Sequence, residues 1–238
     1  MCILLGIRRP GDGGELWVAA NRDERLSRPW EAPRLLVHDP PVFGGRDLVG
    51  GGSWLVVNLP AGFVVGVTNA RPGAPPAQRS RGRLVVDLAA ERTLADAVAL
   101  LSELEFSRYG EFNLLLADAR DSWLATNTPT ARIEAGEENV VAIGNEPLTG
   151  RGERVVAAAE RARFLAGLPE GELARSLQEL LADHEGADPL CRHGEGYGTV
   201  CSTILTLRAG RVGRYLFAPG PPCTTPFAPV RVPAPPIN

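Results

Sequence analysis

The chain contains no lysine, because all 25 basic residues among its 238 residues are arginines. This absence excludes a phosphate-binding loop, which needs a lysine to reach the phosphates, and a Schiff-base enzyme, which needs a lysine amine. Methionine is equally scarce, since Met1 is the only one. An amine that acts as a base must therefore be the α-amine of the chain itself.

Charge clusters and long apolar runs are also missing. The 25 arginines are scattered among 28 acidic residues and leave a formal net charge of -3, so we expect no nucleic-acid partner. No apolar run approaches the ~20 residues of a membrane helix, so we expect no membrane span. The apolar start, residues 2–7, lacks the basic prefix and the cleavage site of a signal peptide, which favours a cytoplasmic location.

The four cysteines follow no known pairing motif. Cys2, Cys191, Cys201 and Cys223 include no C-x-x-C pair, so their spacing predicts neither a disulfide framework nor a standard zinc motif. Cys191 and His193 lie in a glycine-rich loop, where simple exposure is the alternative to ligation. We therefore expect no metal and no other cofactor.

Groups of strands alternate with pairs of helices along the chain. Apolar runs predict strands over residues 2–7, 16–20, 53–57, 63–67, 112–118, 122–126, 139–143, 199–207 and 212–217. Helical patterns run over 84–104, with Thr93 as a plausible N-cap, and over 150–166 and 171–184. This grouping favours an α+β fold, a four-layer αββα sandwich of two antiparallel sheets flanked by helix layers.

The end of the chain differs in composition from the rest. Eight of the 21 prolines lie between Pro219 and Pro236, and proline continues neither a helix nor the interior of a sheet. We therefore expect a single domain over residues 1–218 and an extended tail over 219–238.

Cys2 is the residue most directly suited to a catalytic role. A cysteine is small enough for the initiator methionine to be removed before it, which leaves a free α-amine on the residue that carries the thiol. The amine titrates near ~8 and the thiol near ~8.5, so one residue would hold both a nucleophile and a general base without a histidine. The alternative is a small apolar residue that opens a strand.

A polar cluster, Asn21 to Arg25, follows the strand that pairs with the first one. In a tight hairpin the first residue of one strand neighbours the last residue of the other, so this cluster should lie beside Cys2. Strand alternation puts Asn21 and Asp23 on one face and Arg22 and Glu24 on the other. The alternative is a solvated strand end with ion pairs.

Seven short motifs occur together in this chain, in a fixed order. They are Met1-Cys2-Ile3, Ala20-Asn21-Arg22-Asp23-Glu24 with Arg28-Pro29, Gly44-Gly45-Arg46-Asp47, Gly51-Gly52-Ser53-Trp54-Leu55, Val67-Thr68-Asn69-Ala70-Arg71, Ser80-Arg81-Gly82-Arg83 and Phe112-Asn113-Leu114. In this combination the chain resembles the NRDE family, also called the transport and Golgi organisation protein 2 family. That family is grouped with the N-terminal nucleophile hydrolases, whose four-layer αββα sandwich agrees with the expected element grouping.

The resemblance to the cholylglycine hydrolase and penicillin V acylase branch of these hydrolases implies catalytic roles. Cys2 would be the nucleophile, Asp23 would hold the α-ammonium group, and Arg22 would lower the pKa of the thiol. That branch separates its Arg and Asp by two residues, whereas Arg22 and Asp23 are adjacent. Asn69 and Asn145 would donate to the oxyanion, although an Asn at a strand end is also a common turn former.

Other residues are candidates for substrate binding or for a solvated helix face. Asn21, Trp54 and Arg71 are candidates for the substrate-binding site, while a tryptophan in a hairpin is more often part of the core. The helix at 150–166 carries Glu153, Arg154, Glu160 and Arg161, which we interpret as its solvated face.

The resemblance implies a hydrolase that cleaves a linear amide of a small molecule. The alternative is a non-catalytic carrier that binds a hydrophobic ligand in the same pocket, since eukaryotic members of the family are connected with haem trafficking and with lipid or acyl-CoA homeostasis. The chain has three histidines and no C-x-x-C-H motif, which gives little support to a fixed haem ligand.

Overall fold

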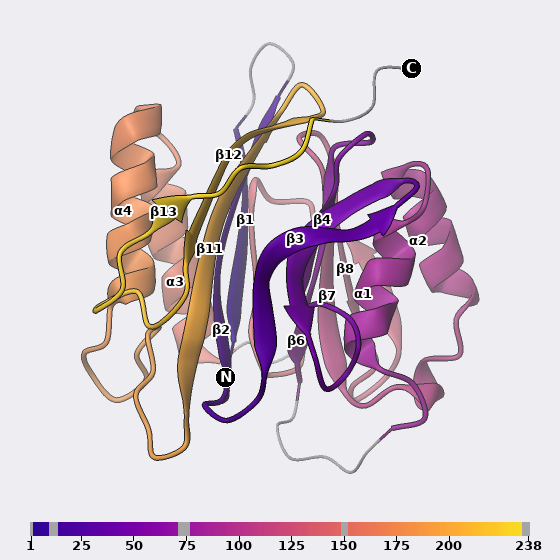
Figure 1. Ribbon diagram of the computed structural model, residues 1–238, viewed down its shortest axis with the longest axis horizontal. Coiled ribbons are helices and arrows are strands. Elements are labelled where there is room, and N and C mark those ends of the chain that lie inside the picture. Colours follow the sequence, from indigo (N-terminus) through magenta and orange to yellow (C-terminus); the bar gives the residue numbers. More distant parts are fainter. Residues whose placement is uncertain (1, 10–13, 71–76, 149–151, 235–238) are drawn as a thin grey trace.

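The computed structural model contains two antiparallel sheets packed face to face, with a pair of helices on each outer side (Figure 1). It describes residues 2–9, 14–70, 77–148 and 152–234. The four-layer αββα sandwich expected from the sequence is confirmed.

The six-stranded sheet carries the N-terminus of the chain. Its order is β10-β1-β2-β11-β12-β13, with β1 at Ile3–Arg9, β2 at Glu15–Arg25, β10 at Val140–Ile143, β11 at Tyr197–Arg208, β12 at Arg211–Ala218 and β13 at Ala228–Pro229. Ile3 lies opposite Asn21 on β2, and Leu4 lies opposite Ile143 on β10. The predicted N-terminal hairpin is therefore confirmed. Cys2, which directly precedes β1, lies between the C-terminal end of β2 and the residues that follow β10.

The seven-stranded sheet is a meander in which each strand pairs with the next along the chain. Its strands are β3 (Trp30–His38), β4 (Pro41–Asp47), β5 (Leu55–Asn58), β6 (Phe63–Asn69), β7 (Phe112–Ala117), β8 (Ser122–Thr126) and β9 (Arg132–Ala135). The sequence did not predict β3, β4 or β9, because proline, glycine and charged residues interrupt their apolar pattern. In β4, glycine is required at Gly45, because an added Cβ would lie 2.2 Å from the Trp54 ring.

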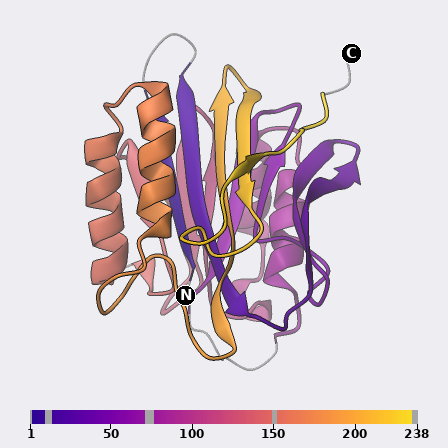
Figure 2. The same ribbon diagram turned by 60° about the vertical axis from the view of Figure 1, so that its left-hand side comes forward.

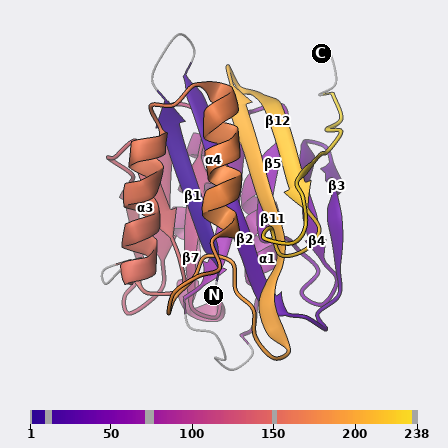
Figure 3. The ribbon, with the colours of Figure 1, turned by 90° about the vertical axis from the view of Figure 1, so that its left-hand side faces the viewer.

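Each sheet is covered by its own pair of helices. Helices α1 (Arg81–Ala89) and α2 (Leu94–Glu103) contact the seven-stranded sheet. Helices α3 (Glu153–Leu165) and α4 (Glu170–Ala182) contact the six-stranded sheet and lie in front of it in Figure 3. The helical pattern expected over 84–104 is divided into α1 and α2, and Thr93 caps α2 as predicted: its hydroxyl accepts a hydrogen bond from the Asp96 N–H at 3.0 Å. No helix within the described ranges is long and apolar enough to cross a membrane.

Side chains alternate between the layers along β1 and β2. Ile3 and Leu5 pack under α3 and α4, whereas Leu4 packs between the sheets. The same alternation turns Asn21 and Asp23 of β2 toward the helices and Arg22 toward the second sheet.

The proline-rich segment contributes a short edge strand. Residues Ala228 and Pro229 pair with Phe217 and Leu216 of β12, beside which the yellow C-terminal segment lies in Figure 2. The prediction that this segment cannot continue a sheet is therefore wrong for these two residues. A proline is tolerated here because β13 is the outermost strand.

Candidate active site

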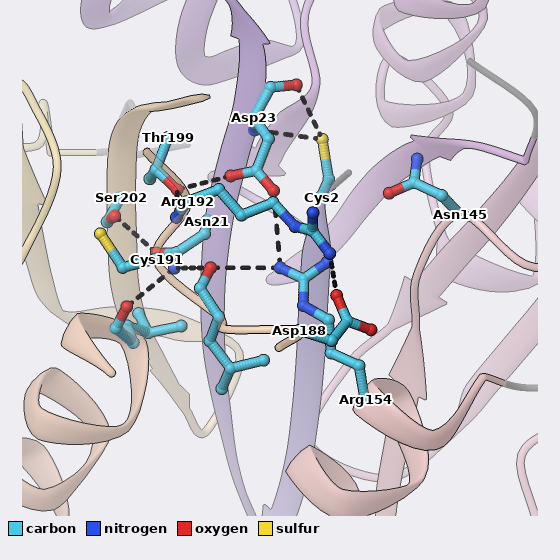
Figure 4. Close-up of polar contacts among 12 residues, drawn as sticks. Cys2, Asn21, Asp23, Asn145, Arg154, Asp188, Cys191, Arg192, Thr199 and Ser202 are labelled. Atoms are coloured by element: carbon cyan, nitrogen blue, oxygen red, sulfur yellow. Dashed lines mark hydrogen bonds and ion pairs between the residues drawn. The ribbon is translucent and has the colours of Figure 1, made fainter. Parts of the chain in front are cut away.

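Cys2 is half-buried and touches the main chain of Asp23. The Asp23 N–H lies 3.4 Å from Cys2 Sγ, and the thiol lies 3.6 Å from the Asp23 carbonyl oxygen, so the thiol both accepts and donates (Figure 4). The hairpin register, in which Ile3 lies opposite Asn21, brings Cys2 level with Arg22 when it is continued by one residue, and so next to Asp23. The thiol, just before the start of β1, is thus held next to an acidic residue near the end of β2.

The side chain of Asp23 is completely buried, in a polar environment. Its Oδ1 accepts a hydrogen bond from the Thr199 hydroxyl at 2.7 Å, and its Oδ2 lies 3.5 Å from Arg154 Nη2. The Tyr197 hydroxyl donates to the Asp23 carbonyl at 2.9 Å. Burial raises the pKa of Asp23 above its ordinary value, and Thr199 and Arg154 offset part of that rise.

The interpretation of Arg154 as a solvated residue is wrong. Arg154 lies in the first turn of α3, is buried, and also donates to the Leu190 carbonyl at 3.1 Å. It shares the buried face of α3 with Ala158 and Ala162, four and eight residues further on. This spacing was the signal that could have identified it, whereas Glu153, Glu160 and Arg161 are exposed as expected.

Arg22 and Trp54 meet between the two sheets. The Arg22 guanidinium carbon lies 4.4 Å from the centre of the Trp54 ring, and Nη2 lies 3.4 Å from Asp47 Oδ2. Both residues line, with Cys2, a cavity of about 10 Å³. Arg22 Nη1 is buried and has no hydrogen-bond partner among the described residues.

The pKa of the Cys2 thiol is raised, not lowered. Burial is the largest cause, the charge of Asp23 adds to it, and the opposing effect of Arg22 is smaller. Arg22 lowers this pKa, as expected, but burial and the charge of Asp23 raise it by more, so the net shift is upward. The thiol is protonated at neutral pH and needs a separate base.

Asn145 follows β10 and lies on the other side of Cys2 from β2. The pairing of Leu4 with Ile143 brings Cys2 level with Asn145 when it is continued by two residues, and Figure 4 shows the two residues near each other. Asn145 Nδ2 donates to the Asn69 carbonyl at the end of β6, which connects the two sheets. Asn145 Oδ1 is buried and has no hydrogen-bond partner among the described residues.

Two residues that the sequence analysis did not assign hold this turn in place. Asn113 Nδ2 donates to the carbonyls of Gly144 and Glu146, at 3.0 and 2.8 Å. The Thr68 hydroxyl also donates to the Gly144 carbonyl. Both residues lie in sequence motifs described above, which was the available signal, and they position Asn145 from the seven-stranded sheet.

The Asn21 side chain connects β2 to α4, to the loop after α4 and to β11. Its Nδ2 donates to the carbonyls of Leu181 and Leu190, both at 2.8 Å, and its Oδ1 accepts from the Ser202 hydroxyl at 2.6 Å. These bonds engage both polar atoms of the side chain on the helix side of β2, so we correct its expected role in substrate binding. Trp54 remains beside Cys2, and Arg71 lies outside the described residues.

One solved structure shares this architecture with the chain. The fold is similar to that of the Caenorhabditis elegans N-acylethanolamine-hydrolyzing acid amidase ortholog, with a TM-score of 0.62 and 13% identity over 86% of this chain and 92% of that one. Eukaryotic HslV from Trypanosoma brucei matches with a TM-score of 0.40 and 13% identity, over 74% of this chain and 88% of that one. Among curated proteins, none matches the chain. Residues 1–216 match the family described as Transport and Golgi organisation 2, and the chain therefore belongs to that family, with an N-terminal nucleophile hydrolase fold.

Proposed function

We propose that this protein, after removal of Met1, is an N-terminal cysteine hydrolase that cleaves a linear amide C–N bond in a small molecule. The observation that carries the proposal is the contact of the half-buried Cys2 thiol with Asp23, whose carboxylate lies within a buried polar network. A protein of similar fold is, by its name, an amidase that hydrolyses N-acylethanolamines, which supports the reaction class.

The reaction needs no group beyond the chain and water. The α-amine of Cys2 takes the thiol proton, and the thiolate attacks the carbonyl carbon of the amide. The resulting ammonium gives its proton to the leaving nitrogen, the C–N bond breaks, and a thioester remains on Cys2. A water molecule, deprotonated by the same amine, then attacks the thioester, which releases a carboxylic acid and restores the thiol.

Asn145 is the donor we assign to the oxyanion. Its Nδ2 carries two hydrogens, of which one goes to the Asn69 carbonyl, and the second is oriented by the same contact. Asn69 then acts through its main chain by positioning Asn145. This assignment differs from the expected one, in which the Asn69 side chain itself donates.

Asp23 supplies the counter-charge for the α-ammonium. Arg154 and Thr199 fix the carboxylate, so it is oriented before the amine is released. While Met1 is attached, the nitrogen of Cys2 is an amide and has no basic lone pair. Because the thiol pKa is raised by burial, the unprocessed chain lacks an activated nucleophile, and removal of Met1 switches the site on.

The alternative of a carrier for haem or an acyl chain needs a larger enclosed space than the cavity beside Cys2 offers. The cavity that the described residues form beside Cys2 has a volume of about 10 Å³, which holds roughly one water molecule. Ligand pockets of that kind enclose ~300–1,000 Å³. We infer that a small amide approaches Cys2 from its exposed side, and that the free thiol works in a reducing compartment such as the cytoplasm.

The state of the N-terminus tests the proposal. We expect intact-mass measurement to show a chain without Met1, and iodoacetamide to label its Cys2 at pH 7 at least tenfold faster than in chains that retain Met1 after inhibition of methionine aminopeptidase. Retention of Met1 in the cell, or equal labelling rates in the two forms, contradicts the mechanism.

Two matched asparagine variants test the oxyanion donor, with hydrolysis of fluorogenic acyl amides as the measurement. Asn145→Ala should lower kcat by about 10²–10³-fold. Asn69→Ala keeps its main-chain carbonyl and should stay within tenfold of the wild type. The reverse order assigns the oxyanion to the Asn69 side chain.

A further inference from the structure

Three side chains that commonly bind metals meet away from Cys2. Cys191 and His193 lie in the loop between α4 and β11, and Cys223 lies in the proline-rich segment after β12. Cys191 Sγ lies 3.5 Å from Cys223 Sγ and 3.7 Å from His193 Nε2, and His193 Nε2 lies 3.0 Å from Cys223 Sγ. Cys191 is buried, Cys223 is half-buried and His193 is exposed.

These separations match those of ligands on one tetrahedral zinc ion. Zn–S bonds of ~2.3 Å and Zn–N bonds of ~2.0 Å at tetrahedral angles separate two sulfurs by roughly 3.8 Å and a sulfur from a nitrogen by roughly 3.5 Å. The three observed distances lie within about half an ångström of these values. A small shift of the side chains is enough for all three atoms to face one ion.

The chemistry of the donors selects the ion. Two thiolates and one imidazole favour zinc over calcium or magnesium, which prefer oxygen ligands. Two thiolate charges also balance the charge of Zn²⁺, so the completed site adds no net charge to a partly buried position. The exposure of His193 leaves the fourth position open to water.

We propose that Cys191, His193 and Cys223 bind one Zn²⁺ ion, with water as the fourth ligand. The sequence spacing did not predict this site, because its third ligand comes from a segment about 30 residues further along the chain and only the fold brings it close. His184, whose ring centre lies 5.9 Å from that of His193, is not assigned as a ligand, because it is not among the residues whose donor atoms lie within 4.8 Å of one another.

The ion would fix the loop that supports the active site. The Leu190 carbonyl, next to Cys191, accepts hydrogen bonds from Asn21 and Arg154. The Arg192 N–H donates at 2.8 Å to the Thr199 hydroxyl, which in turn donates to Asp23 (Figure 4). Zinc at this loop therefore positions the network around Asp23 without touching the substrate.

Metal binding by the full chain tests the proposal. We expect the chain, purified under reducing conditions and then stripped with a chelator, to bind one equivalent of Zn²⁺ by elemental analysis. With Co²⁺ as the probe, it should show the thiolate-to-cobalt charge-transfer band. Cys223→Ser should lose the band, and His193→Ala, at an exposed position, should weaken Co²⁺ binding at least tenfold.

Two control variants separate this site from other metal ligands. Cys2→Ser removes the thiol beside the N-terminal amine, which is a possible chelator, and should keep the full equivalent of metal. His184→Ala should bind Co²⁺ as tightly as the wild type. The proposal is overturned if the reduced chain binds no metal, if Cys2→Ser abolishes binding, or if His184→Ala weakens binding while His193→Ala does not.

Discussion

Replacement of Arg154 by methionine isolates the buried ion pair at the centre of the site. Methionine keeps an unbranched side chain and removes only the guanidinium, which lies 3.5 Å from Asp23 Oδ2 and 3.1 Å from the Leu190 carbonyl. The side chains of Arg154 and Asp23 are 3% and 0% exposed, so solvent screens their interaction little. Removing one member of a buried ion pair lowers the free energy of unfolding by ~3–5 kcal/mol. Because Thr199 still donates to Asp23, we expect Arg154→Met to lower it by about 3 kcal/mol at pH 7.5.

The loss of stability should depend on pH in a defined direction. Burial already raises the pKa of Asp23, and removal of the Arg154 charge raises it further. Between the pKa of Asp23 in the unfolded chain and its pKa in the folded variant, the folded state binds more protons than the unfolded state. The free energy of unfolding of Arg154→Met therefore falls as pH rises through this window, and the deficit relative to the wild type is smallest in acid.

Urea denaturation followed by tryptophan fluorescence measures this deficit at several pH values. The matched control is Arg161→Met, on the same helix as Arg154. It removes the exposed ion pair with Asp183 and should lower the free energy of unfolding by less than about 1 kcal/mol. The double variant Asp23→Asn with Arg154→Met should recover part of the stability, because no buried carboxylate charge remains. The reasoning is refuted if Arg154→Met costs no more than Arg161→Met, or if its deficit does not grow with pH.

Three further outcomes follow from thiol burial, glycine packing and helix capping. In chains that retain Met1, the iodoacetamide labelling rate of Cys2 should still be rising at pH 9, because burial raises its pKa above the ordinary value of a thiol; a plateau below pH 9 contradicts this. Gly52→Ala should lower stability by about 3 kcal/mol or more in urea denaturation, because its Cβ would lie 2.0 Å from a backbone carbon, whereas Gly171→Ala, with open space around it, should raise stability by about 0.5 kcal/mol; equal effects would argue against the packing. Thr93→Ala should cost about 1 kcal/mol by thermal unfolding and Thr93→Ser much less, and equal losses would exclude the cap.

The layers of the fold were predictable because most strands carry continuous apolar runs. The hairpin of β1 and β2 reads directly from residues 2–7 and 16–20, and the alternation along β2 correctly separated Asp23 from Arg22. In contrast, β4 contains Gly44 and Gly45, whose role depends on Val56 and Trp54 packing against them from β5 and the preceding residues. A pattern along one segment does not carry that information.

The candidate site was predictable where its residues are neighbours along a hairpin. Cys2 and Asp23 came from such a pair, and Asn145 came from a family resemblance. Arg154, by contrast, is charged and lies among exposed polar residues, so its burial becomes understandable only when Asp23 is known to lie beneath α3. Cys223 meets Cys191 through a turn of the proline-rich segment, a contact that no local spacing encodes.

The order of strands in the six-stranded sheet sets the order in which the site closes during synthesis. Cys2 and β2 emerge from the ribosome together, but β10 and β11, which complete their surroundings, begin at Val140 and Tyr197. At ~5–20 residues per second, β10 is synthesised roughly 7 to 28 s after the first strand. During that interval neither Asn145 nor Thr199 has been synthesised. An aminopeptidase can therefore reach Met1 before the residues that surround the site are present. Under the proposed mechanism, translation thus gives the chain a period in which the α-amine of Cys2 can be freed.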